Sequence, residues 1–182
     1  MKDVFERIYS QNGWGNAQSR SGDGSEFKQT EAIRAKLPDL FKEFSVTSLL
    51  DIPCGDFNWM QLLDLDIEYV GADVVAELIE RNQLRYGRPR RHFEILDITQ
   101  QTLPNVDLIL CRDLLVHLSF GEIENALANI TRSGSRYLLT TTFPSRGVNS
   151  DIKAGQWRPL NLQRPPFSFP PPIWLITEHC TE

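Results

Sequence analysis

Short apolar stretches alternate with amphipathic ones through the middle of the chain. Apolar runs that predict β-strands lie at Ser48–Leu50, Tyr69–Gly71, His92–Leu96, Val106–Leu110 and Arg136–Thr142. Apolar residues at helical spacing predict helices at Trp59–Leu63, Val75–Tyr86 and Gly121–Ile130. Strands that are apolar on both faces and alternate with helices are typical of a parallel sheet covered by helices. The pattern therefore predicts an α/β fold with a Rossmann-like parallel sheet flanked by helices.

Residues 1–45 precede the predicted sheet and are helical in pattern. Two sets of apolar residues at helical spacing begin at Val4 and at Ile33. Between them, Trp14–Ser25 is too rich in Gly and Ser to form regular structure. We expect a helical cap over 1–45, whose loop either folds over a ligand or lies mobile on the surface.

Residues 144–182 are irregular and rich in proline and aromatic residues. The five prolines of Arg164–Pro172 exclude a helix and a central strand, and Ile173–Glu178 is the last strand candidate. The aromatic side chains favour burial, so this segment forms either a wall or lid over a site or a polyproline stretch packed on the outside. With an α/β core at 46–143, the sequence predicts a single domain in three parts.

The composition is that of a globular protein of 182 residues, with 41% apolar and 24% charged residues and a net charge of -5. No apolar run approaches the length of a membrane span, and the start of the chain lacks the apolar core of a signal peptide. The acidic balance gives no general attraction for nucleic acid. An arginine cluster within residues 81–91 forms either a solvated patch or a site for an anionic partner.

Three cysteines, Cys54, Cys111 and Cys180, are widely separated and form no CxxC pair. Their odd number and spacing indicate free thiols in a reducing compartment, which predicts a cytoplasmic protein. The same spacing argues against a disulfide framework and against a zinc site, so we expect no metal.

The turn after the first predicted strand is the most informative stretch for function. Asp51, Gly55 and Asp56 lie within Ser48–Met60, where a strand runs into a turn and then an expected helix. Ligands of open α/β sheets bind outside the carboxyl ends of the strands. A dinucleotide requires a helix N-terminus free of negative charge for its pyrophosphate, and Asp56 would repel it. An acidic turn instead suits a cation without phosphate, such as the sulfonium S-adenosylmethionine.

An aspartate follows each of the first four predicted strands, at positions Asp51, Asp73, Asp97 and Asp113. Four carboxylates on the same edge of a sheet predict an acidic pocket. Asp73 lies at the spacing from the first turn at which an acid accepts both ribose hydroxyls. Asp97, with the backbone of Ile98, is placed for the adenine amino group. Asp51 and the Gly55 backbone are placed for the methionine portion.

These motifs resemble those of the class I S-adenosylmethionine-dependent methyltransferases, over residues 46–143. Asp51–Phe57 stands where the family usually has acid-x-Gly-x-Gly-x-Gly, but Pro53 and Phe57 replace the first and third glycines and only Gly55 remains. Trp14-Gly15 and Ser19–Ser25 are similar to the N-terminal segment of a poorly characterised subgroup with a DxPCG first motif. The resemblance implies cofactor contacts from Trp14, Ser21, Gly22, Asp51, Pro53, Cys54, Gly55, Asp73, Val74, Asp97, Ile98, Cys111 and Arg112.

The family's sheet normally ends with a reversed seventh strand beside the sixth. After Glu178 this sequence contains too few residues for such a strand. We therefore expect a class I methyltransferase fold that lacks the last strand, either because the sheet stops at six strands or because the sequence is a shortened form of a longer protein.

His117 and Asp113 are the candidate catalytic residues. They are four residues apart and would share one face if a helix begins there, so that the carboxylate orients the imidazole as a base. In the alternative interpretation Asp113 caps the helix and His117 is a packed, hydrogen-bonded residue. Arg112 could meet an anionic acceptor, or pair with Asp113 or Glu122.

The leading hypothesis is an S-adenosylmethionine-dependent methyltransferase that acts on a small-molecule acceptor. One alternative is a catalytically silent binding module with a methyltransferase fold. A nucleic-acid methyltransferase is disfavoured by the net charge, and an NAD-dependent oxidoreductase by Asp56 and the missing glycines. The sequence predicts neither the acceptor nor the oligomeric state.

Overall fold

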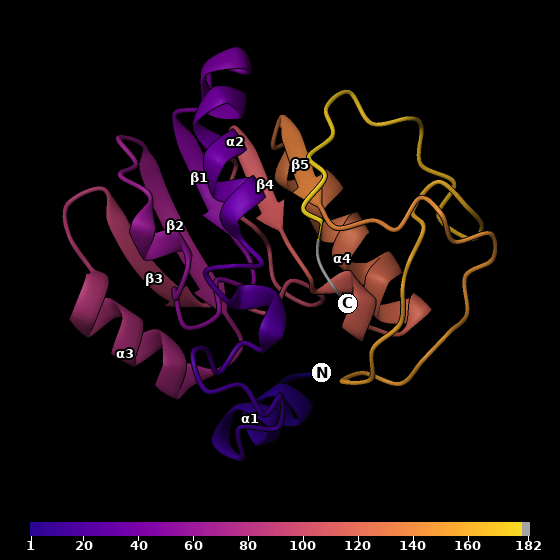
Figure 1. Ribbon diagram of the computed structural model, residues 1–182, viewed down its shortest axis with the longest axis horizontal. Helices are drawn as coiled ribbons and strands as arrows, with labels where there is room; N and C mark the ends of the chain where they lie inside the picture. Colours follow the sequence, from indigo (N-terminus) through magenta and orange to yellow (C-terminus); the bar gives the residue numbers. More distant parts are fainter. Residues whose placement is uncertain (180–182) are drawn as a thin grey trace.

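The computed structural model describes residues 1–179 and contains a parallel sheet of five strands in the order β3-β2-β1-β4-β5 (Figure 1). The strands are β1 (Ser48–Asp51), β2 (Glu68–Asp73), β3 (Arg91–Ile95), β4 (Leu108–Cys111) and β5 (Tyr137–Thr140). Every neighbouring pair is parallel. The sheet confirms the predicted α/β fold, and each of these strands falls within about two residues of its predicted bounds or inside them.

Four α-helices surround the sheet within the described residues. They are α1 (Lys2–Ser10), α2 (Glu31–Glu43), α3 (Ala76–Tyr86) and α4 (Phe120–Ser133). The helix predicted at Trp59–Leu63 is wrong, because only a 3-10 turn forms, at Met60–Leu62. Phe57, just before the predicted helix, is buried in a left-handed conformation with φ of 58°, so the chain enters this segment from an irregular turn.

Alternate residues of each strand face the two layers of the core, as the pleat requires. Leu49 of β1 packs with residues of α2 and α3, whereas Leu50 packs with residues of α4. The second layer also includes Leu160 and Leu162, so the irregular chain after β5 covers part of that face. This arrangement leaves the carboxyl ends of the strands uncovered by the layered helices. There, α1 and the loop after it lie across the end of the sheet (Figure 1).

The chain after β5 forms no strand within the described residues. The strand predicted at Ile173–Glu178 is therefore wrong. Pro170, Pro171 and Pro172 precede it directly and offer no N–H groups for a ladder. Its Trp174 packs instead edge-on against Phe44, with the ring centroids 5.8 Å apart.

The proline-rich run itself packs on the outside of α4. The rings of Phe167 and Phe120 meet at right angles, with their centroids 5.4 Å apart. None of residues 164–172 lines the large cavity described below. Of the two alternatives for this run, the structure favours the packed segment over the lid.

The arginine cluster near β3 is a surface feature. Arg88 lies within ion-pair distance of Asp64, and Arg90 pairs with Asp66 and Glu68. The side chains of Asp64 and Asp66 are fully exposed. These pairs favour the solvated patch over a site for an anionic partner.

Cys54 and Cys111 are buried free thiols, and Cys180 lies outside the described residues. Within residues 1–179 no helix is long and apolar enough to cross a membrane. The same residues contain no cluster of His, Cys, Asp or Glu that could hold a metal ion.

Candidate functional site

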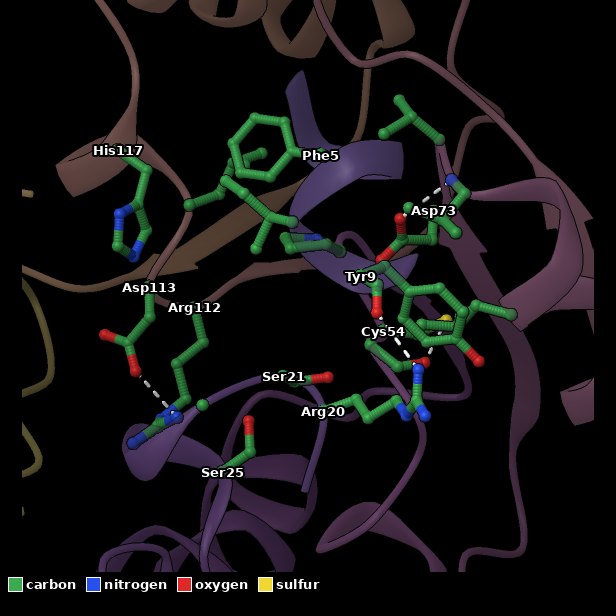
Figure 2. A pocket seen from close by; sticks show the side chains of 18 of the residues that line it. Phe5, Tyr9, Arg20, Ser21, Ser25, Cys54, Asp73, Arg112, Asp113 and His117 are labelled. Carbon is green, nitrogen blue, oxygen red and sulfur yellow. Dashed lines mark hydrogen bonds and ion pairs between the residues drawn. The ribbon is translucent and has the colours of Figure 1, made fainter. Parts of the chain in front are cut away.

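A cavity of about 420 Å³ lies where the strands end, between the sheet and α1 (Figure 2). The turns after three strands line it with Asp51–Gly55, Asp73–Val75 and Arg112–Leu114. The N-terminal region contributes one face of α1 and the loop residues Arg20–Ser25. A volume of this size suits a small-molecule ligand.

Two buried carboxylates, Asp51 and Asp73, line one end of the cavity. Asp51 accepts a hydrogen bond from the Tyr69 hydroxyl at 2.6 Å, and Asp73 accepts one from the Val75 backbone N–H at 3.1 Å. Burial raises the pKa of Asp51 to about 7 and that of Asp73 to about 6. Among the described residues neither carboxylate forms an ion pair, so this end of the cavity is suited to a cation.

Gly55 occupies the place where the first turn meets the N-terminal loop. Its φ is +52°, and a Cβ atom there would lie 2.2 Å from the Ser21 hydroxyl oxygen. The Gly55 carbonyl accepts a hydrogen bond of 2.7 Å from the Asn82 side chain. Only glycine, which has no side chain, allows the Ser21 hydroxyl to lie this close to the turn. Gly55 therefore permits the N-terminal loop to pack against the turn after β1.

Asp56 has a different role from the one its position suggested. Its carboxylate accepts hydrogen bonds from the Ser19 hydroxyl and the Arg20 backbone N–H, both at 2.9 Å. It does not line the cavity, and no α-helix follows it, so it neither faces a ligand nor guards a helix N-terminus. Asp56 instead fastens the N-terminal loop to the motif turn.

Arg112 connects three separate parts of the chain beside the cavity. It pairs with Asp113 at 2.7 Å and with Glu178 at 2.6 Å, and it donates to the Gly24 carbonyl at 2.8 Å. Its guanidinium also lies over the Trp59 ring. The expected pairing with Asp113 is confirmed. The alternative partner, Glu122, instead forms the capping box of α4 with Ser119.

His117 lies at the other end of the cavity from Asp73 and Cys54 in Figure 2, on the same side as Asp113 and Arg112. Its Nδ1 is 3.0 Å from the Gln156 carbonyl oxygen, and its ring is 4.6 Å from that of Trp14. Burial lowers the pKa of the imidazole. The ring is therefore neutral near pH 7.

The predicted Asp113–His117 pairing on a shared helix face is not formed. Residues 115–117 make a 3-10 turn, and α4 begins only at Phe120, with Ser119 as its cap. Asp113 has φ of 55°, and its carboxylate accepts from the Thr141 hydroxyl and pairs with Arg112. Both residues line the cavity, but the imidazole is oriented by a backbone carbonyl instead of a carboxylate.

Most of the other predicted cofactor residues also line the cavity. These are Trp14, Ser21, Gly22, Pro53, Cys54, Val74, Ile98 and Arg112. The Asp97 carboxylate does not, because Thr99 and Gln100 use both of its oxygens. Cys111 is fully buried inside the sheet and does not line it either.

Several aromatic or apolar lining residues were not predicted from the sequence, among them Met1, Phe5 and Trp157. Phe5 belongs to the apolar face of α1. The sequence showed its helical spacing, but not that this face lines a cavity. Trp157 lies in an irregular loop whose path depends on tertiary contacts, and no local signal marks it.

Neither a protein-family model nor a curated protein matches the sequence. Solved structures of similar fold do exist. The methyltransferase domain of bacterial CtHen1 aligns with a TM-score of 0.55 and 16% identity, over 63% of this chain and 66% of that one. A TehB-like SAM-dependent methyltransferase from Corynebacterium glutamicum aligns with a TM-score of 0.51 and 22% identity, over 76% and 72%.

Human N-acetylserotonin methyltransferase, solved in complex with SAM, aligns with a TM-score of 0.50 and 16% identity, over 71% of this chain and 37% of that one. At these identities the likeness establishes the fold. The chain has the class I methyltransferase fold, with five parallel strands in the described residues.

Proposed function

We propose that this chain binds S-adenosylmethionine in the cavity at the strand ends and transfers its methyl group to a small-molecule acceptor. The observation that carries the proposal is a pair of buried carboxylates, Asp51 and Asp73, which form no ion pair within residues 1–179 and lie at one end of a ligand-sized cavity. A sulfonium with an ammonium group would supply the positive charge that these carboxylates lack. When bound, this cofactor supplies an activated methyl group.

The residues fit the parts of that cofactor. Asp73 is assigned to the ribose hydroxyls, and Asp51 with the Gly55 backbone to the amino-acid portion. Ile98 is assigned to the adenine, while the Asp97 carboxylate holds the turn that presents Ile98. Pro53, Cys54, Val74 and Arg112 complete the walls of the site, and Cys111 supports them from within the sheet.

The three parts of the chain take different roles in this proposal. Residues 1–45 form a cap in which Trp14, Ser21 and Gly22 close over the cofactor, and 46–143 form the cofactor-binding core. Residues 144–182 contribute Trp157 to the acceptor side of the cavity. The buried thiols of Cys54 and Cys111 support a location in the reducing cytoplasm.

Calorimetric titration with S-adenosylmethionine and S-adenosylhomocysteine tests the proposal. We expect micromolar binding by the wild type, weakened by about 1–3 kcal/mol in Asp73→Asn, the scale for a lost charged hydrogen-bond partner. Asp64→Asn is the matched control, because it makes the same change on an exposed side chain far from the cavity. NADH should not bind.

The absence of cofactor binding by a folded wild type would contradict the proposal. Equal losses of cofactor affinity in Asp73→Asn and Asp64→Asn would show that the cofactor does not bind in the cavity. Cofactor binding without methyl transfer to any acceptor would favour a catalytically silent binding module.

A further inference from the structure

The neutral imidazole of His117 has its tautomer fixed by a backbone carbonyl. Its Nδ1 is 3.0 Å from the Gln156 oxygen, and a carbonyl oxygen can only accept a hydrogen bond. Nδ1 must therefore carry the proton, and Nε2 has the lone pair. Within residues 1–179 no hydrogen bond engages Nε2, although His117 lines the cavity.

The carbonyl that orients His117 is held by a firmly anchored loop. The Gly155 N–H donates to the His117 carbonyl at 2.9 Å. Arg158 is buried, and its guanidinium donates to the Leu115 and Leu118 carbonyls, both at 2.8 Å. These contacts wrap residues 155–158 around the turn that carries His117, so neither the turn nor the Gln156 carbonyl can rotate freely.

The walls around His117 are flat and apolar. The Trp14 ring lies 4.6 Å from the imidazole, and Phe5, Leu114 and Trp157 line the same cavity. The charged groups nearest to the imidazole are Asp113 and Arg158, and Arg112 pairs with Asp113. Because these charges are already partnered by protein groups, the compartment suits a neutral, planar acceptor.

We infer that Nε2 of His117 accepts the proton of the methyl acceptor, and that the acceptor is a neutral planar molecule with an O–H group, bound against Trp14. This inference rests on the proposed function. The O–H proton moves to Nε2 as the acceptor oxygen takes the methyl group, and the sulfonium becomes a neutral thioether. His117 ends as an imidazolium, which returns its proton to water.

The first test measures the tautomer directly, without any turnover. Two-bond ¹H–¹⁵N correlation spectra of the imidazoles at pH 8 report which nitrogen carries a proton. The chain has three histidines, so the His117 signals are those that disappear in His117→Gln. We expect a protonated Nδ1 and a bare Nε2. A protonated Nε2 would overturn the inference.

The second test uses two neutral probes whose oxygen carries either a proton or a methyl group. Protein saturated with S-adenosylhomocysteine is titrated at pH 8 with 4-methylphenol, which keeps its proton at that pH, and with 4-methylanisole, its methyl ether. We expect 4-methylphenol to shift the Nε2 resonance and to bind about tenfold more weakly to His117→Gln. The affinity for 4-methylanisole should change less than twofold. His92→Gln, an exposed histidine on β3, is the control variant and should change neither.

The outcomes separate this inference from the proposed function. If S-adenosylhomocysteine does not bind, the proposed function fails, while the tautomer is still measured in the free protein. If it binds but His117→Gln affects both probes equally, or the wild type binds neither, the role of His117 is overturned and cofactor binding stands. Unchanged affinity for S-adenosylhomocysteine in His117→Gln shows that the variant is folded.

Discussion

Asp51 illustrates how one residue joins folding and ligand binding in this molecule. Its carboxylate is buried at the end of a central strand, with a tyrosine hydroxyl as its hydrogen-bond donor. Burial disfavours ionisation more strongly than the Tyr69 hydrogen bond and the charge of Arg112 favour it, which is why the pKa of Asp51 rises to about 7. A buried carboxylate at this position reduces the stability of the free protein. Once a cation binds, the ionised carboxylate contributes favourably to the binding.

Replacing Asp51 by Asn should therefore stabilise the free protein and weaken cofactor binding. The amide cannot ionise but can still accept from Tyr69, so the stabilisation should grow by on the order of 2 kcal/mol between pH 5 and pH 8. Urea unfolding at both pH values measures this difference. A variant that is less stable than wild type at pH 8 would show that the ionised carboxylate is not strained by burial.

Gly55 supports a second prediction, because its conformation and its surroundings both exclude a side chain. Gly55→Ala would place Cβ in a left-handed residue and against the Ser21 hydroxyl, so we expect a loss of about 1–3 kcal/mol in unfolding free energy. Binding of S-adenosylhomocysteine should weaken as well. Gly121→Ala, which places its methyl group in open space within α4, is the matched control and should neither destabilise the protein nor weaken binding.

The sequence predicted part of the site at residue resolution. Asp51 and Asp73 could be placed together because parallel strands end at one edge of a sheet. The engagement of Asp97 by Thr99 and Gln100 could not be predicted, since an aspartate after a strand is as able to hold its own turn as to face a ligand. Strand position thus predicts which edge a carboxylate occupies, but not which groups it contacts.

At the scale of elements, the N-terminal loop is held mainly by polar contacts. Asn16 donates to Asp23 and Glu26 and accepts from two backbone N–H groups, and Asp56 binds residues 19–21 from the core. Few apolar side chains secure this loop, so its stability depends on these hydrogen bonds. Such a loop can open to admit a ligand without disturbing the sheet.

Asp56→Ala should release this loop selectively. The substitution removes the acceptor for the Ser19 hydroxyl and the Arg20 N–H, so we expect at least tenfold faster amide exchange at Arg20. Exchange in β1 and β4 should stay unchanged. Asp64→Ala is the control, and uniform acceleration through the sheet would show that Asp56 supports the whole fold instead.

The segments that the sequence mispredicted have an irregular backbone although they contact the rest of the protein. The apolar spacing at Trp59–Leu63 is real, but Trp59 and Met60 reach the core from an irregular turn. Ile173–Glu178 has strand composition, yet Trp174 contacts Phe44, Glu178 pairs with Arg112, and the segment does not join the sheet. The local pattern predicted the burial of Trp59 and Met60 correctly, but Ile173 and Leu175 are exposed. Tertiary contacts decided the backbone conformation in both segments.

At the scale of the whole molecule, two groups of carboxylates give stability opposite slopes with pH. Asp107 accepts from Thr47 and Ser48, which lowers its pKa to about 2, so its contribution is present above pH 4 and is lost as pH falls toward 2. Asp51 and Asp73 have folded-state pKa values of about 7 and 6, above their unfolded values. The folded state therefore binds more protons between pH 4 and pH 7, and these two groups reduce stability as pH rises through that range.

A bound cation should reverse this effect, because positive charge beside Asp51 and Asp73 restores their ionised forms. Binding of S-adenosylmethionine then releases protons, and its affinity should increase by on the order of a hundredfold between pH 5.5 and pH 7.5. Calorimetry in phosphate and in Bis-Tris at pH 6.5 counts the released protons through the different ionisation enthalpies of the two buffers. Asp51→Asn should release fewer protons than wild type. Equal heats in both buffers would mean that Asp51 and Asp73 are already ionised in the free protein, and that burial does not raise their pKa values.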